Sequence, residues 1–190
     1  MKHEHGGRSS GALIDGRELL EGLNIAEGDT FLDAGCGDGY LAVLASGMVG
    51  SSGAVYAVDV HEESLERLRA EVGRRGIENL RSFKADIAEK IPLEDGSVGI
   101  CLLVNVLHGF VANGEDKGAI EEIARVLARG GRLVVVEFKS TGDGADAPGP
   151  PMGQRISKEG TIGLVTAFGF DAQASFDPGP HHYAVVFRKR

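Results

Sequence analysis

An apolar segment that ends in an acid and enters a glycine-rich loop constrains this chain most strongly, at residues 30–40. Gly35, Gly37 and Gly39 alternate with other residues, and the following segment, 40–48, has the apolar spacing of a helix. Glycine adopts positive φ angles, and its missing side chain lets a ligand approach backbone N–H groups. The order predicts a buried strand, a tight turn and a helix start.

The glycine spacing is not that of a dinucleotide-binding loop, which has the pattern G-x-G-x-x-G. The third glycine of that pattern would be residue 40, which is Tyr40. Asp33 before the loop and Asp38 inside it would also repel a pyrophosphate. A cationic ligand therefore suits this loop better.

Strand-like apolar runs alternate with helical segments along the rest of the chain. The predicted strands are 30–34, 54–59, 80–85, 98–104, 133–138, 169–176 and 182–188, and the predicted helices are 13–23, 40–48, 62–74, 116–128 and 158–168. This alternation predicts a parallel α/β sheet, and the last two strands are predicted to form a hairpin. Gly76 and Gly130–Gly131 are expected to end helices, and Ser157 to cap one.

The composition is that of an ordinary globular domain: 190 residues, 42% hydrophobic and 25% charged. The net charge of −8 and the lack of a long basic run disfavour nucleic acid as a partner. No apolar run reaches the roughly 18 residues of a membrane span, and the N-terminus lacks the apolar core of a signal peptide. We therefore expect neither a membrane nor nucleic acid as a partner.

Cysteine and histidine usage favours a reduced, cytoplasmic protein without a metal. Cys36 and Cys101 do not make a disulfide framework. His3 and His5 near the start and the pair at 181–182 do not form a Cys/His quartet, so no metal is expected.

The segment 30–40 resembles motif I of the class I S-adenosylmethionine-dependent methyltransferases, which have a Rossmann-like fold. Residues 55–59 resemble the second strand with its terminal acid, 91–97 the approach to strand four, and 125–133 the turn before strand five. The pattern is most similar to the small-molecule branch of ubiquinone/menaquinone-type, or methyltransferase type 11-like, enzymes. One departure is Gly99, because the family usually has an acid just inside strand four.

The resemblance implies an α/β fold with a doubly wound, mostly parallel seven-stranded sheet, a last antiparallel strand and helices on both faces. Residues 1–12 are expected to be a flexible N-terminal tail, and 13–190 a single methyltransferase domain with a loop insertion at about 140–153. We expect the tail and this loop to order around the ligands, with Arg155 and the N-terminal histidines as candidate cleft-closing groups.

The resemblance also assigns a cofactor site. Asp33 would lie under the methionyl end, Asp59 would accept the ribose hydroxyls, and Asp86 would meet the adenine amino group. The full set of expected cofactor-binding residues is Asp33, Gly35, Gly37, Gly39, Tyr40, Asp59, Val60, Asp86, Ile87 and Asn105. Helix capping remains an alternative for Asp59 and Asp86, and a place in the core for the Tyr40 ring.

His108 is the candidate catalytic residue, because histidine can act as a general base near neutral pH. Gly109 after it is expected to allow a sharp turn that holds the imidazole over the acceptor. Packing between a loop and a helix is the alternative role.

The expected activity is in-line transfer of a methyl group from S-adenosylmethionine, giving S-adenosylhomocysteine, to a small-molecule acceptor. A protein or RNA methyltransferase and a non-catalytic S-adenosylmethionine-binding module remain the alternatives, and a homodimer is left open.

Overall fold

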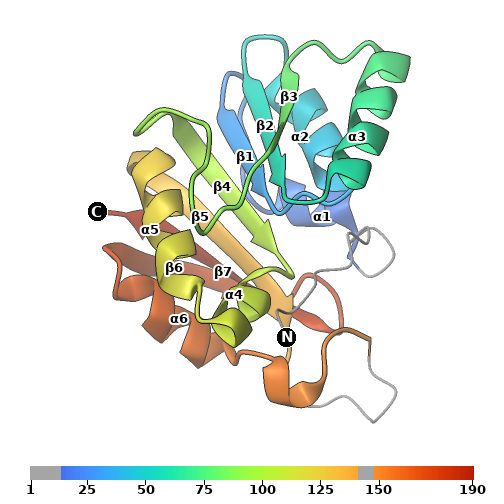
Figure 1. The fold of residues 1–190 in the computed structure, drawn as a ribbon. Helices are drawn as coiled ribbons and strands as arrows, with labels where there is room; N and C mark the ends of the chain where they lie inside the picture. Colours follow the sequence, from blue (N-terminus) through green and yellow to red (C-terminus); the bar gives the residue numbers. More distant parts are fainter. Residues whose placement is uncertain (1–13, 141–147) are drawn as a thin grey trace.

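In the computed structural model, which describes residues 14–140 and 148–190, seven strands form one sheet (Figure 1). The strands are β1 (Thr30–Ala34), β2 (Ala54–Asp59), β3 (Leu80–Lys84), β4 (Val98–Val104), β5 (Leu127–Phe138), β6 (Phe170–Phe176) and β7 (His182–Lys189), in the order β3-β2-β1-β4-β5-β7-β6. Only β7 pairs antiparallel with its neighbours, β5 and β6. The predicted mostly parallel sheet with a last antiparallel strand is confirmed.

Helices cover both faces of the sheet, as expected (Figure 1). One face carries α1 (Gly16–Glu21), α2 (Tyr40–Val49) and α3 (Glu62–Arg75), and the other carries α4 (Leu107–Asn113), α5 (Asp116–Val126) and α6 (Lys158–Thr166). Because side chains alternate along a strand, Phe31 packs toward α1 and α2, while Leu32 packs toward the opposite helices. A short 3₁₀ turn, η2 (Met152–Gln154), precedes α6.

The strand order reverses between β1 and β4. From β1 the chain moves outward through β2 and β3, and from β4 it moves the other way through β5. In open α/β sheets, ligands bind outside the carboxyl ends of the strands at such a reversal. The loops that follow β1, β2 and β4 meet at this edge.

Two of the predicted helix ends agree with the structure. Gly76 follows α3 with φ of 65°, and its N–H donates to the carbonyls of Val72 and Gly73. The Ser157 hydroxyl accepts the N–H of Gly160 at 3.0 Å at the start of α6. Helix α1 is shorter than the predicted 13–23, since Asp15 caps it.

The predicted helix end at Gly130–Gly131 is wrong. Helix α5 ends at Val126, and β5 begins at once rather than at residue 133. The pairing of β4 with β5 shifts register around Gly99. Gly130 has φ of 75°, and a Cβ on Gly131 would lie 3.1 Å from the Gly99 carbonyl oxygen. The two glycines therefore serve a bulge in β5.

The sharp turn predicted at Gly109 is also wrong, because Gly109 lies inside α4, a helix absent from the sequence prediction. The chain instead reverses at Asn105, which has φ of 57°. Asparagine tolerates this left-handed conformation better than most residues. The turn therefore lies directly after β4, and α4 places His108 one helical position inside its start.

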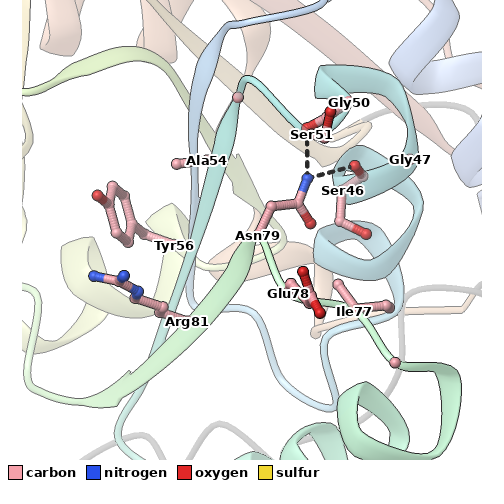
Figure 2. A pocket seen from close by; sticks show the side chains of 12 residues that line it. Ser46, Gly47, Gly50, Ser51, Ala54, Tyr56, Ile77, Glu78, Asn79 and Arg81 are labelled. Atoms are coloured by element: carbon pink, nitrogen blue, oxygen red, sulfur yellow. Dashed lines mark hydrogen bonds between the residues drawn. The ribbon is translucent and has the colours of Figure 1, made fainter.

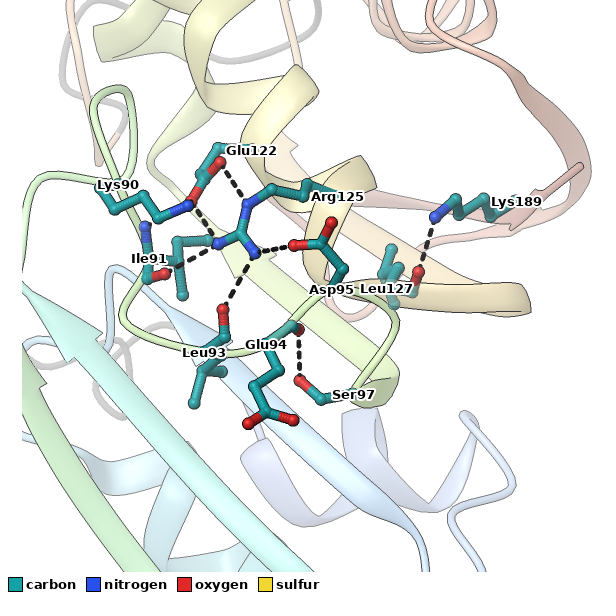
Figure 3. A network of polar contacts seen from close by, with 10 residues as sticks. All are labelled: Lys90, Ile91, Leu93, Glu94, Asp95, Ser97, Glu122, Arg125, Leu127 and Lys189. Atoms are coloured by element: carbon teal, nitrogen blue, oxygen red, sulfur yellow. Dashed lines mark hydrogen bonds and ion pairs between the residues drawn. The ribbon is translucent and has the colours of Figure 1, made fainter.

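Arg125 of α5 holds the loop that leads into β4 (Figure 3). Its guanidinium donates to both oxygens of Glu122 at 2.6 and 2.8 Å, and to Asp95. It also donates to the carbonyl oxygens of Ile91 at 2.9 Å and Leu93 at 3.0 Å. One planar side chain thus bonds two backbone carbonyls of this loop and two acidic side chains.

Candidate cofactor site

Three buried polar atoms without a hydrogen-bond partner gather at the carboxyl edge, within the described residues. They are Asp33 Oδ2 near the end of β1, His61 Nε2 after β2 and Asn105 Oδ1 after β4. These three strands are neighbours in the sheet. Leaving a buried polar group unpaired costs about 1–3 kcal/mol, and such a group calls for an explanation. These atoms make the carboxyl edge a candidate site for a polar ligand.

The loop after β1 needs its glycines for shape. Gly35, Gly37 and Gly39 have φ of 77°, 54° and 77°. A Cβ on Gly35 would lie 2.6 Å from Val106, and one on Gly39 would overlap Leu68. The alternating glycines therefore let the loop pass tightly between β1 and α2.

The N–H groups of this loop are bonded inside the protein. Those of Gly35 and Cys36 donate to the carbonyl oxygen of Val58 at 2.7 and 3.0 Å, and that of Gly37 donates to Asp59 at 2.8 Å. The loop is thus fastened to β2.

Asp59 joins the glycine loop to the start of α3. It is buried, with one carboxylate oxygen on the Gly37 N–H and the other on the His61 N–H at 2.9 Å. Residue His61, not Asp59, is the N-cap of α3. Each carboxylate oxygen has two lone pairs, so Asp59 can still accept hydroxyl groups.

Asp33 is a carboxylate with strongly perturbed acidity at this edge. Burial raises the pKa of Asp33 to about 7, the N–H of Ala42 opposes the shift, and the charges of Asp59 and Asp38 add to it. A cation beside Asp33 would reverse this effect, because opposite charge favours the ionised carboxylate. The site therefore favours a positively charged ligand.

The remaining expected cofactor residues are spread around the same edge. Val60 is 45% exposed directly after β2. Asp86 follows β3 and accepts the Ala88 N–H at 2.9 Å, while Ile87 is buried in the core. The Tyr40 ring lies against α1, since a Cβ on Gly16 would be 2.6 Å from it. Tyr40 is thus at least partly a packing residue.

His108 is buried and paired with Glu137 near the end of β5. Its Nδ1 lies 2.8 Å from one carboxylate oxygen, and its backbone N–H donates to the other at 3.1 Å. Sequence reasoning missed Glu137 and His61. The available signals were an acid inside the apolar strand 133–138 and a histidine two residues after Asp59.

Arg155 holds the flanks of residues 141–147. Its guanidinium donates to the carbonyl oxygens of Lys139, Pro148 and Pro150, and it lies 5.4 Å over the Phe138 ring. The expected tail at 1–12, its histidines and the centre of the loop at 140–153 lie outside the described residues.

The described residues also bear on two other kinds of site. They contain no group of three or more His, Cys, Asp or Glu side chains arranged to hold a metal ion. In 14–140 and 148–190, no helix has the length and apolar character to cross a membrane.

A cavity of about 690 Å³ lies at the opposite edge, beside the amino ends of β2 and β3 (Figure 2). Asn79 lines it and donates to the carbonyl oxygens of Ser46 and Gly50, while the Ser46 hydroxyl donates to Val43. The unpartnered atoms named above all lie at the carboxyl edge. The carboxyl edge, rather than this cavity, is therefore the candidate functional site.

A family model described as "Methyltransferase domain" matches residues 32–135. A solved S-adenosylmethionine-dependent methyltransferase from Aquifex aeolicus has a TM-score of 0.83 and 27% identity, covering 93% of this chain and 90% of that one. The chain belongs to the class I methyltransferase family, whose cofactor is S-adenosylmethionine.

The ubiquinone/menaquinone biosynthesis C-methyltransferase of Azotobacter vinelandii is 35% identical over 123 residues, which are 64% of this chain and 47% of that protein. An uncharacterized 37.1 kDa transposon protein of Streptomyces fradiae is 35% identical over 122 residues, 33% of its length. The chain thus matches half or less of these relatives. SpnF, a [4+2]-cyclase, shares the fold with a TM-score of 0.77 at 21% identity, covering 98% of this chain and 84% of that one.

Proposed function

We propose that this chain transfers a methyl group from S-adenosylmethionine to a small-molecule acceptor. The observation that carries the proposal is the set of unpartnered buried atoms on Asp33, His61 and Asn105 at the edge where the strand order reverses. The family match supplies the chemistry: the cofactor brings a methyl group on a positively charged sulfur.

The side chains are proposed to hold and orient the cofactor. The Asp33 carboxylate attracts the positively charged methionyl end, and Asn105 accepts from its amine. Asp59 accepts the ribose hydroxyls, and Asp86 accepts from the adenine amino group. Gly35, Gly37, Gly39, Tyr40, Val60 and Ile87 complete the proposed contacts. His61, which sequence reasoning did not include, joins the set through its unpartnered Nε2.

Positioning is the main contribution of the protein to the reaction. The methyl group moves by in-line displacement, so the acceptor must face the methyl carbon opposite the sulfur. Holding both reactants in line and excluding water supplies much of the rate enhancement.

The acceptor class is proposed from charge and from the relatives. The net charge of −8 disfavours RNA, and the C-methyltransferase of A. vinelandii acts in quinone biosynthesis. A ubiquinone/menaquinone-type small molecule is the preferred class, and a cytoplasmic location fits the unpaired cysteines Cys36 and Cys101.

A cofactor-binding module without transferase activity is the second candidate. SpnF supports this second candidate, because its similar fold belongs to a protein described as a cyclase.

Calorimetric titration with S-adenosylmethionine, S-adenosylhomocysteine and a nicotinamide dinucleotide tests the binding step. We expect micromolar affinity for the first two and none for the third. Binding of the dinucleotide alone would contradict the proposal. Methyl transfer from labelled S-adenosylmethionine to a panel of small acceptors, an RNA and a protein mixture then separates an enzyme from a binding module.

A further inference from the structure

Glu137 and His108 form a buried pair beside the candidate cofactor site. Glu137 is 1% exposed and His108 5% exposed. They come from different elements, β5 and α4, and 29 residues separate them in the chain. A buried carboxylate in the middle of an apolar face has a large desolvation cost, so its contacts should show what it does.

Within the described residues, both hydrogen-bond donors to Glu137 belong to His108. The His108 backbone N–H donates to Oε1 at 3.1 Å, and Nδ1 lies 2.8 Å from Oε2. An ionised carboxylate only accepts, so Nδ1 must carry a proton in this pair. The neutral imidazole then has its lone pair on Nε2, which becomes the basic nitrogen of the ring.

Tyr183, the cross-strand partner of Glu137, has polar contacts of its own. Its hydroxyl donates to the Ile156 carbonyl oxygen at 2.9 Å and lies 2.6 Å from the Thr161 hydroxyl. Burial raises the pKa of Tyr183 above its usual range, and the charge of Glu137 adds to the shift. Tyr183 therefore remains neutral, and its hydroxyl bonds to groups other than Glu137, whose carboxylate pairs with His108.

Exposed apolar side chains lie on α4, which carries His108, and on the neighbouring η2. Val111 follows His108 by three positions on α4, so the two share a helix face, and Val111 is 41% exposed. Helix α4 packs against η2, where Met152 is 44% exposed (Figure 1). Val111 and Met152 thus give the exposed surface of α4 and η2 an apolar character, which suits an apolar molecule.

We propose that Glu137 positions His108 as a general base for an apolar acceptor whose methylated atom carries a removable proton, such as a phenol-like hydroxyl. This inference rests on the proposed function. In the step, His108 Nε2 takes the proton of the acceptor, whose freed electron pair forms the new bond to the methyl carbon. The bond between carbon and sulfur breaks with its electrons on sulfur, and the imidazolium returns its proton to water.

The tautomer of His108 can be measured without knowing the acceptor. Long-range ¹H–¹⁵N spectra distinguish a protonated Nδ1 from a protonated Nε2, and the His108→Asn variant assigns the signal among the six histidines. We expect protonated Nδ1 in the unmodified protein. A neutral His108 protonated on Nε2 would overturn the proposal, whatever the variants do.

Glu137→Gln is the decisive variant. Glutamine has only one side-chain oxygen, so it cannot accept both the His108 backbone N–H and Nδ1–H. Its NH₂ would face one of these atoms and favour the tautomer with the proton on Nε2. We expect this change in the spectrum, and we expect Glu137→Asp to retain protonated Nδ1.

Activity is measured with labelled S-adenosylmethionine and two acceptors of the same alkyl chain, an alkylphenol and a dimethylalkylamine. The phenol loses a proton on methylation and the tertiary amine has none to lose. We expect transfer to the phenol, with kcat about 10²-fold lower in Glu137→Gln and KM nearly unchanged. Transfer to the amine alone, or transfer to the phenol with equal kcat in the variant, would refute the base.

Two controls separate the possible causes of failure. Glu122→Gln removes a partly buried carboxylate far from His108 in the Arg125 network, and should leave kcat and the tautomer unchanged. S-adenosylhomocysteine affinity is measured for every variant. If the unmodified protein does not bind S-adenosylhomocysteine, the proposed function is rejected. If Glu137→Gln binds it normally and has an unaltered tautomer and kcat, only the role of Glu137 is rejected.

Discussion

The two edges of the sheet differ in how completely their buried polar groups are hydrogen-bonded. At the amino edge, Arg125 satisfies the loop before β4, including the Ile91 and Leu93 carbonyls (Figure 3). At the carboxyl edge, Asp33 and Asn105 keep buried oxygens without partners. Both loops are tightly held, yet only one is left incompletely bonded. This difference distinguishes polar residues that stabilise the fold from polar residues that are proposed to bind a ligand.

Backbone conformation does not follow this division. Gly35, Gly37, Gly39 and Asn105 at the carboxyl edge have positive φ, but so do Gly28, Gly50 and Gly96 at the amino edge. Unpaired buried polar atoms therefore carry the comparison, because they cost stability and proteins tolerate them where function requires them. Substitutions at the two edges should therefore divide into effects on unfolding and effects on binding.

Arg125→Ala should have the largest effect of all, and only on stability. It removes the guanidinium from Glu122, which keeps the Ile91 N–H, and leaves two backbone carbonyls without their donor, so the free energy of unfolding should fall by about 2–4 kcal/mol. Urea unfolding measures this, and calorimetry with S-adenosylhomocysteine should show unchanged affinity. Lys117→Ala, which removes an exposed i,i+4 pair, is the control and should change stability by under about 0.5 kcal/mol. If Arg125→Ala instead lost much of its affinity for S-adenosylhomocysteine, the amino edge would also contribute to binding, and the two edges would not differ in role.

Asp59→Ala should have the largest effect on binding. Charge-assisted hydrogen bonds to hydroxyls are lost, so S-adenosylhomocysteine affinity should fall by roughly 1.5–3 kcal/mol. The Gly37 and His61 N–H groups also lose their acceptor, which should lower stability as well. Asp95→Ala at the amino edge is the matched control and should leave affinity intact. Equal affinities in the two variants would mean that the ribose lies elsewhere.

The sequence predicted the order of elements well because local patterns decide them. Apolar runs identified all seven strands, and the glycine loop with Asp33 indicated the edge that holds the candidate site. It failed where contacts distant in sequence decide the local structure. Gly131 lies against Gly99 in a bulge, and no local pattern distinguishes that from a helix end.

The candidate site was predicted to a similar extent. Acids that end strands can be recognised from position alone, as with Asp59. Glu137 could not be assigned a partner, because its pairing with His108 depends on how α4 folds back over β5. Likewise, the unpartnered Asn105 oxygen and the positive φ of that residue emerge only with the fold.

Asp33 should make cofactor binding pH-dependent. Its pKa is raised to about 7 in the folded protein, above the ordinary value of 3.8, so the folded state binds the extra proton between these values. Stability from this group is full below about pH 4 and is lost as the pH rises through 7. Asp33→Asn should therefore stabilise the ligand-free protein at pH 8, with less gain at pH 5.

Binding should show the opposite trend, because a cationic ligand favours ionised Asp33. We expect S-adenosylmethionine to bind about tenfold more tightly at pH 8 than at pH 6, with proton release near pH 6.5. Calorimetry in buffers of different ionisation enthalpy measures the released proton, and Asp33→Asn should release none. A pH-independent affinity would place the positive charge of the ligand away from Asp33.

Asn105→Gly should give the smallest effect and the sharpest test of the comparison. Glycine relieves the φ of 57° and removes the unpaired oxygen, offset by greater freedom in the unfolded chain. The ligand-free protein should be equally stable or gain up to about 1 kcal/mol, while S-adenosylhomocysteine affinity falls. Asn24→Gly is the matched control, because Asn24 also has positive φ, 50°, but is exposed and lies in the loop after α1. It should gain similar or smaller stability without losing affinity. If Asn105→Gly instead lost stability and kept full affinity, Asn105 would belong with the structural residues such as Arg125.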